Sequence, residues 1–515
     1  MKLSYIQLPI LHAALIACIR ISPPTATVVS GPIFGAAADL PGAPGPVNKF
    51  LGIPYAEKPE RFALPQPPRK WKDPKDATAF GSSCHQLAVT IDVGPDQDLV
   101  DYLRPPGGRA VVLFFHGGGW SLSNGLFDLS GFAGYEDIVA FTFNYRTNIF
   151  GFPNAGDIPV GERNLGLFDQ RLALQWVQQN AKAFGGDPSK VTVWGLSAGS
   201  LSIDILMHAY AGVEKPPFRG AIMSSGEYSF SMWGFAADPR DTSQWDNIAK
   251  AAGCNRNKIQ CLRELSPEKL LDAAVKAGAR FMPIQDNKAV PSGRATAWRQ
   301  GKVAKVPLLA GTTAQEGRSL VNPHISLEKF DQVYLAAPLV TKQNRDAIYE
   351  YYRKQSNVKS NFELASMIYT DLLWQCPMRK LTTISSSINN PTWRYYFNIS
   401  MTEMLPEKYQ FLGKFHGIDI RLLFGSPTYH GSSSAGGLYT PVLSRFLTYW
   451  RGAIGKFVRD PSGGPGWPTV GSPSAPFDIV SLGDVGSVHS AGATPMNQTE
   501  VDWFLISYKG GKHNK

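Results

Sequence analysis

The sequence lacks several features that would set it apart from ordinary globular chains. Five cysteines in 515 residues are too few for a small disulfide-stapled scaffold. Beyond residue 26 no apolar run is long enough to cross a membrane, which excludes a protein with several membrane spans. Internal repeats and low-complexity linkers are absent as well, so nothing in the sequence divides it into an array of modules.

Concentrated positive charge is also missing. The chain has 51 Lys and Arg against 41 Asp and Glu, a formal net charge of +10. These basic residues are scattered, apart from Lys509, Lys512 and Lys515 at the C-terminal end. A scattered excess is typical of a solvated surface, so we predict no nucleic-acid partner.

The N-terminal residues predict a secretory signal peptide over residues 1–26, which leaves 27–515 as the mature chain. Lys2 precedes an apolar run at 8–19 that is shorter than a membrane span, and residues 24–26 offer a small-residue cleavage site. A buried N-terminal helix is the alternative interpretation. The signal peptide predicts a secreted protein.

Two further patterns agree with secretion. Cys254 and Cys261 lie seven residues apart and can close a short loop in an oxidising compartment, so we expect a disulfide between them. Asn398 and Asn497 each begin an N-glycosylation sequon. The pairing of the remaining mature-chain cysteines, Cys84 and Cys376, is left open by the sequence.

Apolar runs of strand length alternate with helical patterns along the chain. Continuous apolar runs favour central parallel strands that are buried on both faces. They occur at 110–115, 138–145, 191–194, 221–224 and 306–310. Leu165, Phe168, Leu172 and Trp176 line one face of a predicted helix that stops at Gly185. We therefore predict one α/β domain over 27–515, with a large, mainly parallel sheet between helices and mostly helical residues 320–390 over its carboxyl edge.

Residues 191–200, V-T-V-W-G-L-S-A-G-S, predict a nucleophile elbow. A strand runs into Gly195-x-Ser197-x-Gly199, and a helical segment follows. Such a sharp turn lifts the Ser197 hydroxyl clear of the sheet and places it at a helix N-terminus. The glycines are needed because a Cβ at either position would collide with a neighbouring element.

A glycine run, H-G-G-G-W at 116–120, directly follows the predicted strand at 110–115. Consecutive glycines let backbone N–H groups approach a substrate oxygen closely. Acyl transfer needs such donors because the carbonyl oxygen becomes negatively charged in the transition state. We assign the N–H groups of Gly118, Gly119 and Ala198 to this oxyanion hole.

A serine nucleophile needs a base, normally a histidine oriented by a carboxylate. His416 is the candidate base because the adjacent Gly417 permits a tight loop that aims the imidazole ring. Glu316 is the candidate acid because it follows the predicted strand at 306–310, in the chain order Ser–acid–His that accompanies this elbow. Asp419 is a rival for the acid, although its position three residues after His416 fits a supporting role better.

Taken together, these motifs resemble the type-B carboxylesterase family, the cholinesterase-like branch of the α/β hydrolases, and most of all its fungal secreted members. The matching stretches cover nearly the whole mature chain. They are residues 50–56, 116–119, 144–146, 164–166, 169–171, 184–188, 195–199, 225–226, 261–263, 316–317, 416–417 and 467–468. The resemblance implies an α/β-hydrolase fold, a triad of Ser197, Glu316 and His416, and a supporting serine at Ser225.

The same resemblance implies a deep gorge lined by aromatic side chains. Its candidates here are Trp120, Tyr228, Phe230 and Trp233, each of which could equally belong to the core. Leu196 stands where cholinesterases carry Glu, which argues against choline esters and other quaternary-ammonium substrates. Residues 98–104 stand where the family has a cysteine-containing strand. In this chain the segment is shortened and has no cysteine. A natural variant and an error in the gene sequence are the two explanations for this difference.

The function predicted from these observations is a serine esterase that hydrolyses carboxylic esters through an acyl-enzyme. Within this class, a lipase for long acyl chains and a tailoring esterase for a secondary metabolite are alternatives. A cholinesterase-like adhesion protein without catalysis is the alternative from another class, but the intact triad positions and glycine run disfavour it. The expected partner is a small ester molecule, and the sequence suggests neither a metal nor an organic cofactor.

Overall fold

The computed structural model describes residues 23–86, 108–231, 238–335, 340–399, 405, 407–424, 441–471, 479–483 and 493–496. Several predicted features lie outside these residues: most of the signal peptide, the segment 98–104, Trp233 and Asn497. Within the described part of the chain, no helix combines the length and the hydropathy needed to cross a bilayer.

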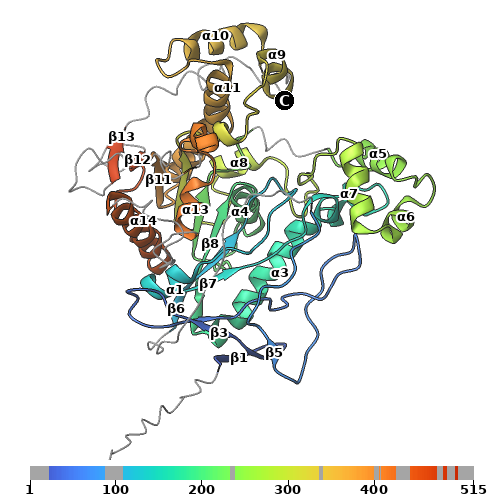
Figure 1. The fold of residues 1–515 in the computed structure, drawn as a ribbon, viewed down its shortest axis with the longest axis vertical. Helices are drawn as coiled ribbons and strands as arrows, with labels where there is room; N and C mark the ends of the chain where they lie inside the picture. The colour runs from blue at the N-terminus through green and yellow to red at the C-terminus, as the bar shows by residue number, and fades with distance from the viewer. Residues whose placement is uncertain are drawn as a thin grey trace, which may run out of the picture.

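The molecule is organised around an eight-stranded sheet (Figure 1) with the strand order β13-β12-β11-β10-β9-β8-β6-β7. Seven neighbouring strands run parallel, and only β13 is antiparallel to its neighbour. The strands are β6 Arg109–Phe115, β7 Ile138–Thr142, β8 Gly186–Leu196, β9 Gly220–Ser224, β10 Leu308–Thr313, β11 Thr392–Phe397, β12 Ile479–Leu482 and β13 Ala493–Met496. The predicted α/β class and mainly parallel sheet are therefore confirmed.

Strand β6 shows why its apolar run is continuous. Val111, Leu113 and Phe115 belong to one hydrophobic cluster, whereas the alternate residues, such as Val112, belong to another on the opposite face. Successive side chains of a strand point to opposite faces, so both faces of β6 are buried. The sequence overestimated β7, because after Thr142 the chain leaves the sheet.

Helices cover both faces of the sheet. Residues of α3 (Leu165–Asn180), α4 (Ala198–Ala209) and α12 (Cys376–Ser387) contribute to the first cluster. Those of α13 (Ile418–Phe424) and α14 (Pro441–Arg459) contribute to the second. The first face also includes α8 (Arg294–Arg299), and the second α1 (Ser130–Glu136). Helix α3 begins as predicted at Leu165, and a 3-10 turn leads it to Gly185, whose φ of 80° ends the element.

Residues 320–390 are mostly helical, as predicted. They form α9 (Leu327–Phe330), α10 (Lys342–Arg353), α11 (Asn361–Thr370) and two π-helical turns, and they run into α12. In Figure 1, α9, α10 and α11 form one end of the molecule, opposite the N-terminal strands. Helix α11 packs on η4 (Glu316–Ser319), the 3-10 turn beyond the carboxyl end of β10, so this layer lies over the carboxyl edge of the sheet.

The N-terminal region forms the short strands and loops expected from its prolines. Two small sheets, of order β1-β2-β5 and β3-β4, precede the main sheet. Their strands are β1 Thr25–Val28, β2 Gly31–Phe34, β3 Ala36–Ala38, β4 Val47–Lys49 and β5 Lys75–Asp76.

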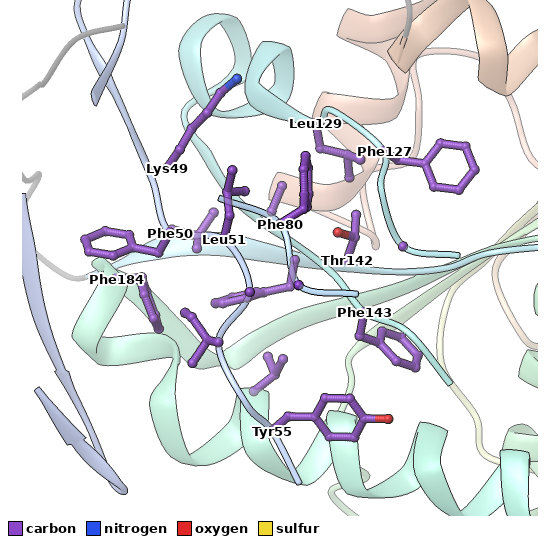
Figure 2. Close-up of a pocket in the computed structure, with 18 of the residues that line it drawn as sticks. Lys49, Phe50, Leu51, Tyr55, Phe80, Phe127, Leu129, Thr142, Phe143 and Phe184 are labelled. Atoms are coloured by element: carbon purple, nitrogen blue, oxygen red, sulfur yellow. The ribbon is translucent and has the colours of Figure 1, made fainter. Parts of the chain in front are cut away.

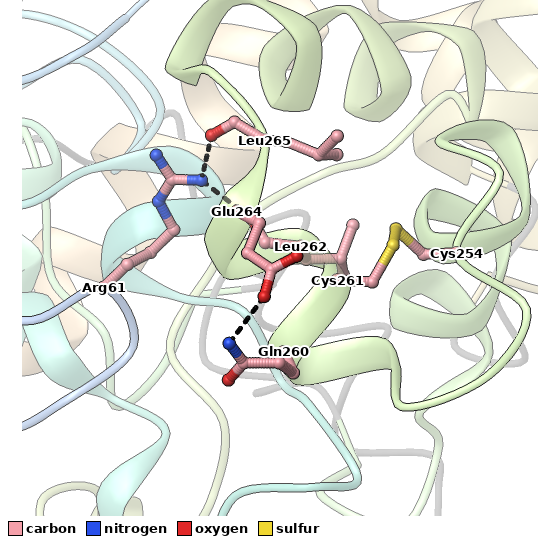
Figure 3. The surroundings of a disulfide bond; sticks show 7 residues. All are labelled: Arg61, Cys254, Gln260, Cys261, Leu262, Glu264 and Leu265. Atoms are coloured by element: carbon pink, nitrogen blue, oxygen red, sulfur yellow. Dashed lines mark hydrogen bonds between the residues drawn. A yellow bond between two sulfur atoms is a disulfide. The ribbon is translucent and has the colours of Figure 1, made fainter.

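A disulfide joins Cys254 and Cys261, as predicted, with their Cα atoms 5.7 Å apart (Figure 3). It links the end of α5 (Ser243–Ala251) to α6 (Lys258–Glu264), and α7 (Pro267–Lys276) completes this helical hairpin. Arg61 ties the hairpin to the N-terminal region, since its Nη1 donates to the carbonyls of Leu262 and Leu265 at 2.7 Å each. Cys84 and Cys376 are both thiols, so they do not form the bridge that the sequence left open.

Candidate active site

Ser197 lies on the sharp turn between β8 and α4, where the sequence places the elbow. Its φ of 54° and ψ of −123° are strained for a residue with a side chain. The flanking glycines permit this turn. A Cβ on Gly195 would lie 2.4 Å from the carbonyl carbon of Gly199, and a Cβ on Gly199 would lie 2.1 Å from the Phe115 oxygen.

The elbow is held by its neighbours in the sheet. The Ser197 N–H donates to the Ser224 carbonyl at 3.0 Å, and the Ser197 carbonyl accepts the first bond of α4 from Leu201. Ala198 is the first residue of α4, so its N–H has no acceptor within the helix. Developing negative charge near this N–H is favoured by the helix dipole.

The glycine loop after β6 adjoins the elbow. A Cβ on Gly117 would lie 2.9 Å from the Cβ of Ser197. Gly118 and Gly119 have φ values of 97° and 59°, and the Gly118 carbonyl accepts the N–H groups of Ser121 and Leu122. Within the described structure, neither the Gly118 nor the Gly119 N–H donates to a protein acceptor, which leaves both able to bind a ligand oxygen.

His116, the first residue of this loop, is fully buried and serves packing. Its ring stacks on Tyr145 with the centroids 4.1 Å apart, and its Nδ1 lies 3.0 Å from the Gly117 carbonyl. Burial lowers the pKa of His116 to about 4, so the ring stays neutral near pH 7.

Glu316 and His416 come together at the carboxyl edge of the sheet. His416 Nδ1 lies 2.6 Å from Glu316 Oε2. The other carboxylate oxygen, Oε1, accepts the Ser225 hydroxyl at 2.7 Å and the Thr313 N–H at 2.6 Å. Because a carboxylate only accepts, Nδ1 carries the proton, and the Nε2 lone pair is available to take one.

The loop that carries His416 lies against the elbow. A Cβ on Gly417, next to the imidazole, would lie 3.3 Å from a Leu196 methyl group, and Leu196 immediately precedes Ser197. The side chains of Ser197 and His416 are both described, and no hydrogen bond joins Ser197 Oγ to the imidazole. In enzymes without substrate this bond is often long and shortens when substrate binds.

Trp374 is a contact of the site that the sequence did not predict. Its ring packs on His416 with the centroids 4.5 Å apart at 41°. It belongs to the π-helical turn η6 (Asp371–Gln375) between α11 and α12. The neighbouring Gln375 fixes this turn to β10, since its Oε1 accepts Thr312 Oγ1 at 2.7 Å and its Nε2 donates to the Thr313 carbonyl at 2.9 Å. A π-helical turn has no periodicity signal in a single sequence.

Asp419 lies behind Glu316 and does not bind the imidazole. Its Oδ2 accepts the hydroxyl of Tyr395 at 2.9 Å, and that hydroxyl also lies 2.8 Å from Ser224 Oγ. Burial, and then the charge of Glu316, raise the pKa of Asp419 to about 7. It contributes to a buried hydrogen-bond network with Tyr395 and Ser224, and the carboxylate that contacts the imidazole is Glu316.

The aromatic residues suggested for a gorge wall divide into two groups. Trp120 and Tyr228 are only 2% and 0% exposed and belong to the hydrophobic core, where their rings pack edge to face. Phe230 is half-buried, and the cationic groups of Arg299 and Lys380 lie 5.6 and 5.7 Å from the centre of its ring. Of the three described residues, only Phe230 is exposed enough to line a wall.

A large cavity lies away from this site. It has a volume of about 1470 Å³ and runs along β7, the end strand of the sheet (Figure 2). Phe50, Tyr55, Phe80 and Phe143 give it apolar walls, and neither Ser197 nor the Glu316–His416 pair lines it. We therefore separate this cavity from the active site, although it is large.

The described residues contain no group of three His, Cys, Asp or Glu side chains that could hold a metal ion.

The fold and the site together define an α/β hydrolase. The defining features are a strained serine at the end of a central parallel strand, a glycine loop beside it and a carboxylate–imidazole pair at the same edge of the sheet.

Comparison with known proteins identifies the family. The model of the Carboxylesterase family matches residues 22–476. The chain is 32% identical over 409 residues to the para-nitrobenzyl esterase of Bacillus subtilis (strain 168), covering 74% of this chain and 80% of that protein. It is 28% identical over 445 residues to the cholinesterase of Mus musculus, with coverages of 75% and 72%. A solved PNB esterase structure has a TM-score of 0.72 at 26% identity and covers 94% of this chain and 99% of its own.

The chain therefore belongs to the carboxylesterase family, and its reaction class is carboxylic ester hydrolysis. This confirms the family resemblance of the sequence motifs. Closeness to the fungal members stays a prediction.

Proposed function

We propose that Ser197, His416 and Glu316 carry out ester hydrolysis as a catalytic triad. Ser197 Oγ attacks the ester carbonyl carbon while His416 Nε2 takes its proton. His416 then gives this proton to the departing alcohol, which leaves an acyl group on Ser197. A water molecule repeats the cycle and releases the carboxylic acid. Glu316 holds the Nδ1–H tautomer and stabilises the imidazolium that forms.

The oxyanion of each tetrahedral intermediate is assigned to the N–H groups of Gly118, Gly119 and Ala198. All three N–H groups belong to segments that adjoin Ser197. Among the described residues, none of the three donates to an acceptor within its own loop or helix. Donors fixed before substrate arrives stabilise the transition state without reorganisation, and one such donor contributes about 10²–10³-fold in kcat.

One observation supports the triad most strongly. Glu316 is fully buried, and its two oxygens together accept from His416, Ser225 and Thr313. Such complete hydrogen bonding satisfies both oxygens of the buried carboxyl group and fixes its orientation. We assign Ser225, which donates to Glu316, as the supporting serine, and Asp419, which accepts from Tyr395, as a buried support of the site.

The substrate that we infer is a neutral ester. Leu196 is half-buried beside the His416 loop and offers an apolar surface where a carboxylate would attract a cation. Rates on nitrophenyl esters of increasing acyl length would separate the esterase from the lipase. A maximum at short acyl chains supports an esterase, and a maximum at long chains supports a lipase. A sharp preference for one unusual acyl group would indicate a tailoring enzyme.

The triad is tested with Ser197→Ala and His416→Ala, with His324→Ala as the matched control because His324 is exposed. We expect both triad variants to lose several orders of magnitude in kcat and the control to keep wild-type activity. Labelling with an organophosphonate followed by peptide mapping should identify Ser197. A wild-type protein that is folded but neither labelled nor active would support the adhesion-protein alternative instead.

We further propose that residues 1–26 are a signal peptide and that 27–515 form one secreted domain. The Cys254–Cys261 disulfide supports passage through an oxidising compartment. Asn398 and Asn497 are the proposed glycosylation sites, although Asn398 Oδ1 already accepts Lys414 Nζ at 2.5 Å. N-terminal sequencing of the secreted protein and enzymatic deglycosylation would test these assignments.

A further inference from the structure

The loop that carries His416 is bound to the turn that carries Glu316 by more than the contact between the two side chains. The Gln315 N–H donates to the Lys414 carbonyl at 3.0 Å. The Lys414 N–H donates in return to the side-chain oxygen Oε1 of Gln315 at 2.9 Å. These two bonds form a closed ring between the residue before Glu316 and the residue two before His416.

From this geometry we infer that Gln315 is a positioning residue, whose side-chain amide fixes the distance and angle between Glu316 and the His416 imidazole. This inference rests on the proposed triad. In a β-ladder both bonds would come from backbone groups; here the amide oxygen of Gln315 replaces one carbonyl, because the chain turns into η4 at Glu316.

The neighbouring glycine agrees with this role. Gly413 has a φ of 56°, and a Cβ on it would lie 2.3 Å from Gln315 Oε1. Only a residue without a side chain lets the amide oxygen approach the Lys414 N–H from this side. Gly413 therefore makes room for Gln315 as well as for the turn of the loop.

The rest of the loop has a separate attachment. Arg318 Nη1 donates to the Phe411 carbonyl at 2.5 Å, and Arg318 Nη2 pairs with Glu363 at 3.3 Å. This attachment lies five residues before His416, whereas the Gln315 ring lies two residues before it. Removal of Arg318 should loosen the loop without changing the direction of the imidazole, which makes it a matched control.

The variants Gln315→Met and Gln315→Glu separate positioning from stability. Methionine keeps the length and volume but lacks a strong acceptor, and glutamate restores the acceptor. We expect Gln315→Met to lower kcat at least about 10-fold with KM within about twofold, since a misplaced catalytic group costs turnover and not binding. Gln315→Glu should recover most of the kcat.

A second pair of variants tests whether both residues act through one contact. Gly413→Ala should lower kcat as Gln315→Met does, and the double variant should be no worse than the worse single variant. Arg318→Met should lower the melting temperature and leave kcat within about twofold.

Organophosphonate labelling of the wild-type protein comes first, because a wild type that is not labelled at Ser197 refutes the triad itself. If the wild type is labelled, a kcat in Gln315→Met equal to that of the wild type would overturn the inference.

Discussion

His416 Nδ1 lies 2.6 Å from Glu316 Oε2, although 100 residues separate the two in the chain. The contact forms because Glu316 follows β10 and the His416 loop crosses the same edge of the sheet. Since Ser225 and Thr313 occupy the other carboxylate oxygen, Glu316 cannot turn away from the ring. The orientation of the His416 imidazole is thus set by Glu316 and its hydrogen-bond partners.

Replacing Glu316 with Gln should cost turnover heavily. The amide of Glu316→Gln can donate as well as accept, which favours the wrong imidazole tautomer. We expect kcat to fall about 10⁴-fold with little change in KM. Steady-state kinetics on a short-chain nitrophenyl ester measure this loss. Glu350→Gln is the control, because Glu350 is exposed and pairs only with Lys354 among the described residues; a Glu316→Gln enzyme with a tenth of wild-type kcat would contradict the assignment.

The two oxyanion glycines should differ in their tolerance of alanine. A Cβ on Gly118 would lie 2.2 Å from the Leu122 oxygen, whereas a Cβ on Gly119 meets nothing within 4 Å. Gly118→Ala must therefore shift the loop, and we expect kcat to fall about 10²-fold or more, as for the loss of one oxyanion donor. Gly119→Ala costs only about 1–2 kcal/mol of backbone strain at its φ of 59° and should keep more activity. The opposite ranking of kcat would refute this placement of the donors.

Asp419 predicts a pH dependence of stability. Burial and the charge of Glu316 raise its pKa from 3.8 to about 7. Between these two values the folded chain keeps a proton that the unfolded chain has lost. Protonated Asp419 therefore contributes stability below its unfolded pKa, and this contribution is lost as the pH rises through about 7.

The variant Asp419→Asn tests this prediction because Asn cannot titrate. The melting temperature of the variant relative to wild type should rise between about pH 5 and about pH 8. Asp346→Asn serves as the control, since Asp346 lies on the surface and pairs with Lys342. A difference for Asp419→Asn that stays constant or falls over this range would show that Asp419 is not protonated in the folded protein.

The disulfide should stabilise the helical hairpin without affecting catalysis. Removing Cys254 and Cys261 together, as Ser, releases a loop of seven residues, for which chain entropy predicts a loss of about 2–3 kcal/mol. Denaturant unfolding measures the loss, and the activity below the transition should be unchanged. Cys84→Ser is the matched control because Cys84 is a thiol. Equal stability of the double variant and wild type would show that the bridge contributes nothing.

Much of the fold could be predicted from local sequence. The apolar run at 110–115 forms β6, and its alternate side chains pack into the hydrophobic clusters on the two faces of the sheet. Strand β8 begins earlier than the apolar run at 191–194 predicts: its first residues are polar, but Gly186 pairs with Arg109 at the start of β6, and the register shifts between Arg109 and Val111. Pairing with a neighbouring strand decided that boundary, and propensity could not.

Local motifs name the candidate residues of the site one by one, but they do not give the geometry of the site. Ser197 and the glycine loop each belong to a short motif of a few residues. Such a motif can be recognised locally, because the spacing of its glycines shows which tight turns the backbone can form. Trp374 and Gln315 were missed, since neither has a local pattern that marks its neighbour. Trp120 was suggested for a wall, and only its 2% exposure places it in the core.

By itself, the sequence determined the elements that need only their neighbours: the buried strands, the elbow at Ser197 and the loop closed by Cys254 and Cys261. Only the tertiary structure decided which distant loops meet, because the register of the parallel sheet brings the ends of β8, β9 and β10 to one edge. Glu316, His416 and Gln315 acquire their relation there, through side-chain and backbone hydrogen bonds between residues that lie far apart in the chain.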